Sequence, residues 1–63
     1  MADFLVQNEG TIVVVTPVTP AAKTWVAEHI PDDAPTWCGG VVIEHRYAFD
    51  VLDGIVNDGL VVA

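Results

Sequence analysis

The stretch TIVVVT, residues 11–16, decides the fold of this chain. Its side chains are β-branched throughout, and β-branched residues favour a pleated strand over a helix. Because consecutive positions are apolar, the stretch offers apolar side chains to both faces of a sheet, which is typical of a central strand. Pro17 ends the strand, since proline has no N–H to donate to a ladder.

This strand is predicted to be the second arm of a hairpin. Phe4 and Val6 predict a short strand, and Asn8-Glu9-Gly10 predicts a turn in which the glycine takes a positive φ. The sequence therefore predicts that residues 3–7 pair with residues 11–16.

A helix follows the strand. Thr19 is a typical N-cap residue, and Pro20 suits the first helical position, where its missing N–H costs nothing. Pro31 ends the helix, which is therefore predicted over residues 20–30. Apolar spacing gives it one buried face, formed by Ala22, Trp25, Val26, His29 and Ile30.

The second half of the chain predicts a loop over residues 31–40, a third strand over residues 41–43 that ends near Glu44, and a second helix from about Arg46. Gly59 is the expected C′ residue of that helix, and residues 60–62 predict a short terminal strand. The buried stripe of the helix is predicted to be Ala48, Val51, Leu52 and Ile55.

This order of elements predicts one α+β domain spanning residues 1–63. We expect a small, mainly antiparallel sheet of three to four short strands, with two helices packed on one face. The sequence shows no repeats and no linker.

The charge is strongly one-sided. Nine carboxylates and two basic side chains give a formal net charge of −7, although 52% of the residues are hydrophobic. Self-repulsion of this size opposes a compact fold, so the imbalance indicates a partner with a basic surface. It disfavours direct nucleic-acid binding and opposes self-association, so we expect a monomer. A chain this short cannot bury all its apolar residues, which indicates an exposed interaction face.

The remaining composition points to the cytoplasm. The single cysteine, Cys38, excludes an internal disulfide and fits a reducing compartment. No apolar run approaches the ~20 residues of a membrane helix, so no membrane partner is expected. The N-terminus lacks the basic and apolar regions of a signal peptide.

Two acidic groups are candidate protein-binding residues. Asp50 and Asp53 lie one turn apart on the second predicted helix, which Asp58 closes, and Asp32-Asp33 lie on the preceding loop. Together they present negative charge that crudely resembles the phosphates of duplex DNA. Taken singly, each aspartate fits a solvated helix face or ordinary turn chemistry equally well.

Trp37 is a further candidate, because it lies in the loop near these aspartates. It either folds over the edge of the core or is an exposed anchor of the kind that interface hot spots favour. Arg46, one of two cations, is expected to pair with a carboxylate at the junction of strand and helix.

The sequence shows no residue pattern typical of a catalytic site or a metal site. His29, Cys38 and His45 match no zinc spacing, so we expect no metal and no cofactor. His29 is better explained as a partly buried histidine with a hydrogen-bonded ring nitrogen, and Cys38 as a small hydrophobe. Gly39-Gly40 lacks the features of a phosphate loop and predicts a turn or a close backbone approach. We expect no enzymatic activity.

Four segments carry a resemblance that covers residues 8–62. They are Thr11–Pro17, the Trp25…His29-Ile30-Pro31 segment, Ile43-Glu44-His45-Arg46-Tyr47 and Asn57-Asp58-Gly59-Leu60. With them the chain resembles a family of very short acidic proteins encoded by phages and other mobile elements of Proteobacteria, and among these it is similar to small anti-CRISPR proteins directed at type I systems, type I-C in particular. The resemblance implies binding to the Cascade surveillance complex and a block of target-DNA capture. It implies no catalytic residues.

Three hypotheses for function follow. The first is a non-enzymatic inhibitor that competes with DNA for a basic protein surface, with charge complementarity that steers association. The second is a structural or assembly module whose apolar surface is a homo-oligomer interface. The third is an antitoxin-like partner of a basic protein, which has the physics of the first and differs only in its target.

Overall fold

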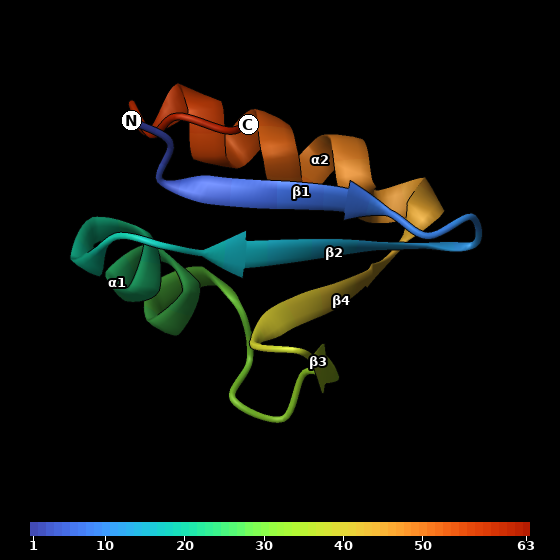
Figure 1. Cartoon of the computed structure of the whole chain (residues 1–63). Helices are drawn as coiled ribbons and strands as arrows, with labels where there is room; N and C mark the ends of the chain where they lie inside the picture. The colour runs from blue at the N-terminus through green and yellow to red at the C-terminus, as the bar shows by residue number, and fades with distance from the viewer.

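One antiparallel sheet and two helices make up the fold (Figure 1), and the computed structural model describes all 63 residues. The strands lie in the order β1-β2-β4-β3, so β2, which contains the VVV run, is an inner strand as predicted. The fold is α+β, as the sequence predicts. The elements are β1 (Phe4–Asn8), β2 (Ile12–Pro17), α1 (Pro20–His29), β3 (Thr36–Trp37), β4 (Gly40–Glu44) and α2 (His45–Asn57).

The residues predicted to begin or end the helices and turns lie at the observed boundaries. The Thr19 hydroxyl accepts a hydrogen bond from the Ala22 N–H at 3.2 Å, and Pro20 is the first residue of α1. Gly10 has a φ of 88° in the β1–β2 turn, and Gly59 has a φ of 84° just after α2. Both glycines therefore occupy the left-handed region that the sequence predicts for them.

The segment between α1 and β4 differs from the prediction. Residues 36–37 form the short strand β3 where a loop was expected, and Cys38 and Gly39 make a two-residue turn into β4. Both turn residues have positive φ, 52° and 81°, which is the geometry of tight hairpin turns. Cys38, which the sequence suggested is a small hydrophobe, has an exposed side chain in this turn.

The C-terminal segment is not a regular strand. Residues 61–63 lie along the outer edge of β1 and make one parallel bridge, between Phe4 and Val62. The N–H groups of Phe4 and Val6 donate to the carbonyls of Val61 and Ala63 at 3.1 and 3.0 Å. The segment therefore covers the first half of an otherwise open sheet edge.

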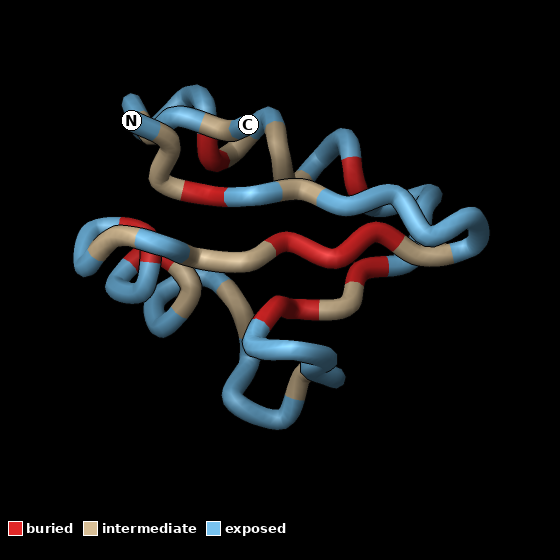
Figure 2. Tube along the Cα trace, in the orientation of Figure 1, coloured by how far each residue is buried: buried red, intermediate tan, exposed pale blue.

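Both helices pack on the same face of the sheet, and the core lies between the helices and the sheet. Figure 2 shows the buried residues running along β2 and β4. The rings of Phe4 and Trp25 meet edge to face at 6.0 Å. The cluster of buried residues comprises Phe4, Val13, Val15, Ala22, Trp25, Val41, Ile43, Ala48 and Ile55.

His29 is more exposed than predicted, because 46% of its side chain is accessible. Its Nδ1 lies 2.9 Å from the Trp25 carbonyl, and its ring stacks on the Trp25 indole at 4.2 Å. The predicted hydrogen bond of the ring is therefore present, but the ring lies over the outer side of Trp25 and not in the core.

Candidate protein-binding site on helix α2

Helix α2 is apolar over more of its circumference than its packing requires. Ala48 and Ile55 are buried against the sheet, and Val51 and Leu52 are half-buried, which confirms the predicted stripe. Phe49 lies beside this stripe and is 82% exposed. A phenylalanine this accessible gains little from burial in the fold, so most of its ring is available for contact with a partner.

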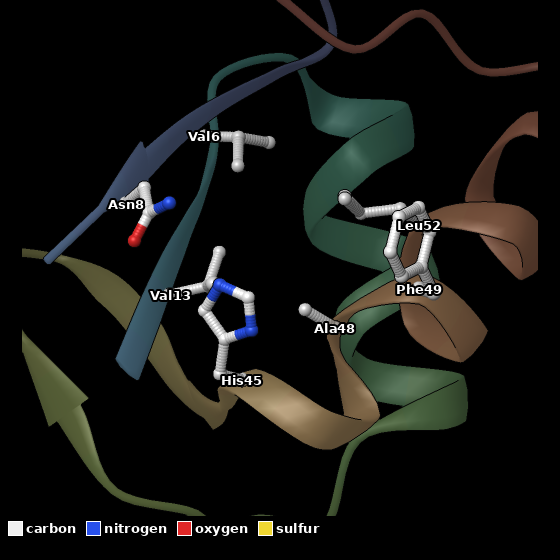
Figure 3. A pocket seen from close by; sticks show the side chains of 7 residues that line it. All are labelled: Val6, Asn8, Val13, His45, Ala48, Phe49 and Leu52. Carbon is white, nitrogen blue, oxygen red and sulfur yellow. The ribbon is translucent and has the colours of Figure 1, made fainter. Parts of the chain in front are cut away.

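A hollow of about 270 Å³ opens next to Phe49, between the first turns of α2 and the end of β1. Figure 3 shows Phe49, Leu52 and Ala48 projecting from the helix toward Val6 and Asn8 on the strand side. We call this hollow the α2 groove. It is lined by Val6, Asn8, Val13, His45, Ala48, Phe49 and Leu52.

The charge beside the α2 groove is negative and uncompensated. Asp50 follows Phe49 and Asp53 lies one turn further on, and both are exposed. Arg46, the cation on this helix, is engaged elsewhere: its Nε lies 3.0 Å from Glu44 Oε2, which confirms the predicted pairing. Its guanidinium also lies 5.0 Å from the Tyr47 ring centroid. Phe49, Asp50 and Asp53 therefore form an apolar and acidic surface on one helix.

The other predicted contact residues do not join this surface. Asp32 and Asp33 are exposed in the loop between α1 and β3, at the opposite edge of the sheet from β1, where Figure 1 shows the loop below β4 and α2 along β1. Trp37 lies on β3 and is 51% exposed. The aspartates thus form two separate acidic groups.

Asp58 is committed to a contact within the molecule. Its Oδ2 accepts a hydrogen bond from Trp25 Nε1 at 2.7 Å and lies 3.6 Å from His29 Nε2. This residue is the C-cap of α2, so the contact ties the end of α2 to α1. We therefore assign Asp58 a structural role in addition to its charge.

Phe49 is the site residue that sequence reasoning missed. The signal was available, because Phe49 falls outside the Ala48-Val51-Leu52-Ile55 stripe of the predicted helix. A large aromatic side chain outside the buried stripe of an amphipathic helix indicates an exposed contact residue. The groove itself was not predictable, because it depends on how α2 lies against β1.

The geometry offers no constellation for metal chemistry, since no group of three or more His, Cys, Asp or Glu residues is placed to hold an ion. None of the helices has the length and apolar character needed to cross a membrane. Comparisons with family models, with curated proteins and with solved structures found no match to this chain.

Proposed function

We propose that this chain is a non-enzymatic protein-binding module that engages a basic, DNA-handling surface of a partner through helix α2. The observation that carries the proposal is Phe49, 82% exposed beside Asp50 and Asp53, on a helix whose single arginine is neutralised by Glu44. An exposed aromatic ring supplies short-range affinity, and the unpaired carboxylates supply steering toward a Lys/Arg-rich surface.

The resemblance to acidic mobile-element proteins names a candidate target. On this proposal the partner is a type I Cascade, the contact lies where Cascade binds target DNA, and the chain acts in the cytoplasm of the bacterial host as an anti-CRISPR inhibitor. An antitoxin-like role uses the same surface on a different basic protein, so the choice of target is a matter for the experiment.

The test is a binding titration of immobilised protein with purified type I-C Cascade, with and without target duplex DNA. We expect DNA to compete with the chain. Affinity should also fall as salt rises, because exposed charge pairs are screened over ~10 Å at 0.1 M ionic strength. Affinity that does not change with salt would show that the carboxylates do not contribute.

Two matched double variants locate the surface. Asp50→Asn with Asp53→Asn should weaken binding by roughly tenfold or more, since loss of about 1.4 kcal/mol is a factor of ten. Thermal stability should stay equal or rise slightly, because the change removes repulsion within one helical turn. Asp32→Asn with Asp33→Asn, at the other sheet edge, is the control for net charge. Equal losses from both pairs would mean that only total charge matters.

A further inference from the structure

The outer edge of β1 is paired over only part of its length. In an antiparallel ladder, residues that bond to the neighbouring strand alternate with residues whose N–H and C=O groups point away from it. Phe4 and Val6 are of the second kind, because their N–H groups donate to residues 61–63 and not to β2. Asn8, two residues further on, also points outward and lies beyond the C-terminal segment. The Val6 carbonyl and the Asn8 N–H therefore lie at this edge without a main-chain partner.

These two free groups match the bonding pattern of a parallel strand. One step earlier on the same edge, Ala63 donates its N–H to the Phe4 carbonyl and accepts the Val6 N–H, both at 3.0 Å. A residue of another extended chain, placed opposite Gln7, can donate to the Val6 carbonyl and accept from the Asn8 N–H in the same way. The ligand that satisfies this part of the edge is therefore an extended main chain.

The α2 groove lies beside the free part of the edge. Val6 and Asn8 line the groove from the strand side. Figure 3 shows Phe49 and Leu52 projecting from α2 on its other side. Successive side chains of a strand point to opposite faces of a sheet, so every second side chain of an added strand points to the helix-covered face. The apolar lining of the groove favours an aliphatic or aromatic side chain at that position.

The charges around this edge are acidic. Glu9 follows Asn8 in the chain, and Asp50 and Asp53 lie on α2. All three carboxylates are exposed, and none of them forms an ion pair. A segment that carries Lys or Arg next to its apolar residue is therefore attracted to this edge, whereas one that carries Asp or Glu is repelled.

We propose that the free edge of β1 and the α2 groove together bind an extended, basic segment of the partner protein by strand addition. This proposal rests on the proposed function and names the part of the partner that helix α2 meets. The segment pairs with Val6 and Asn8 through its main chain, places an apolar side chain beside Phe49 in the α2 groove, and carries Lys or Arg next to it.

Main-chain bonding separates strand addition from the other way of filling the groove. A helix of the partner laid against Phe49 would use side chains alone, because its own N–H groups are bonded within the helix. An added strand loses affinity when its N–H groups are removed, even if every side chain and charge is kept. The experiment therefore changes the main chain and leaves the side chains as they are.

The probe is a short, capped synthetic peptide in which leucine and lysine alternate, titrated into the purified chain and followed by amide NMR. We expect the amide signals of Asn8 and Phe49 to shift on binding, while that of Trp37, on the far strand β3, stays in place. A peptide that alternates leucine and glutamate should not bind, because its charge has the sign of the site. Shifts confined to Trp37 and its neighbours would overturn the proposal.

Two methylated peptides provide the matched comparison. When the leucines point into the α2 groove, a parallel strand directs the lysine N–H groups to β1 and the leucine N–H groups to solvent. Methylation of the lysine main-chain nitrogens should therefore weaken binding by roughly three- to tenfold, the effect of one lost hydrogen bond. Methylation of the leucine main-chain nitrogens should change affinity little. Equal affinities of the two methylated peptides would overturn strand addition.

Asn8 offers the same comparison on the protein. Asn8→Pro and Asn8→Ala both remove the side chain whose Oδ1 accepts the Gly10 N–H at 3.0 Å, but only proline also removes the main-chain N–H. This N–H makes no bond within the fold, and proline is tolerated on an edge strand at such a position. Asn8→Pro should bind the unmethylated peptide roughly three- to tenfold more weakly than Asn8→Ala. If Asn8→Pro does not fold, the methylated peptides test the proposal on the unchanged chain.

The same two variants separate this proposal from the proposed function. Cascade binding that Asn8→Pro and Asn8→Ala share equally would overturn strand addition and leave the proposed function standing. Peptide binding that depends on the lysine N–H groups, in a chain that does not bind Cascade, would support strand addition and contradict the proposed target.

Discussion

Val13, Val14 and Val15 are consecutive and all buried, yet they belong to opposite faces of the sheet. Val13 and Val15 belong to the core cluster beneath the helices, whereas Val14 lies on the other face, next to Gly40. The covered face gains stability from contacts between elements far apart in sequence. The opposite face, which we call the open face because no helix packs on it, has the fully buried Val14 at its centre and the half-exposed Leu5 and Trp37 at its borders. Burial of a residue therefore does not tell which face is closed, and the two faces should respond differently to substitution.

Phe4 and Leu5 give the largest expected contrast, because they are adjacent on β1 and point to opposite faces. Phe4 is fully buried and meets Trp25 edge to face, while Leu5 is half exposed. Phe4→Ala should cost about 3–5 kcal/mol, which is enough to unfold a domain this small. Leu5→Ala should cost about 1 kcal/mol or less.

Urea denaturation at low micromolar protein concentration measures the free energy of unfolding of both variants. Similar losses from Phe4→Ala and Leu5→Ala would break the comparison between a closed and an open face.

Gly40 tests whether the centre of the open face is packed like a core. Gly40→Ala places a methyl group against Val14 and Thr16 at distances that real side chains do not tolerate. Overpacking of this kind should cost about 1–3 kcal/mol. Val14→Ala removes one of the two blocking groups, so the double variant should lose less than the sum of the single variants. Additive losses would show that Gly40 and Val14 do not press on each other.

Sequence reasoning succeeded where the information is local. The β-branched run of residues 11–16 predicted the inner strand, and Thr19-Pro20 with Pro31 predicted helix α1 to within a residue. Apolar spacing predicted the buried stripe of α2. These signals depend on residues within one turn or one strand of each other, so tertiary contacts did not override them.

It failed where an element is too short to leave a pattern, and where residues distant in the sequence meet. The two-residue strand β3 is too short to leave a pattern, and it exists because Trp37 and Gly40 pair across the Cys38–Gly39 turn. The face on which Trp37 lies follows from that pairing. The hydrogen bond from Trp25 to Asp58 joins residues 33 positions apart, and the periodicity of neither helix predicts it. The α2 groove needs the placement of a helix against β1, which no local pattern supplies.

Asp58 links the two helices of the covered face, because its side chain joins α1 to the end of α2. Its carboxylate accepts the Trp25 indole N–H at 2.7 Å, so Asp58→Ala leaves a polar indole nitrogen without its partner. With half of the Asp58 side chain exposed, we expect a loss of about 1 kcal/mol. That corresponds to a drop in Tm of roughly 4–8 °C for a domain of this size.

Asp53→Ala is the control for Asp58→Ala, since Asp53 is exposed and has only a 3.4 Å contact from Asn57. It should leave Tm nearly unchanged. A loss of stability from Asp53→Ala equal to that from Asp58→Ala would make the effect one of helix charge and not of the indole hydrogen bond.

Substitution of Asp3 should give the smallest loss of stability. Asp3 lies at the sheet edge where the C-terminal segment runs along β1. Its carboxylate accepts hydrogen bonds from the Thr19 hydroxyl at 2.7 Å and from the Val61 N–H at 2.9 Å, and so joins the start of β1 to the cap of α1 and to the C-terminal segment. These bonds, chiefly that from Thr19, lower the pKa of Asp3 from its ordinary value of 3.8.

A carboxyl whose pKa is lower in the folded state contributes stability above its unfolded pKa, and the contribution is lost as pH falls through the folded pKa. Wild-type protein should therefore be slightly more stable than Asp3→Asn at pH 7, and the difference should shrink as pH falls below 3.8. Paired thermal melts across this range measure it, with Thr19→Ala as the partner in a double-mutant cycle. A stability difference that stays constant down to about pH 2.5 would mean that the negative charge on Asp3 does not stabilise this edge of the sheet. Packing alone would then stabilise the covered face at β1.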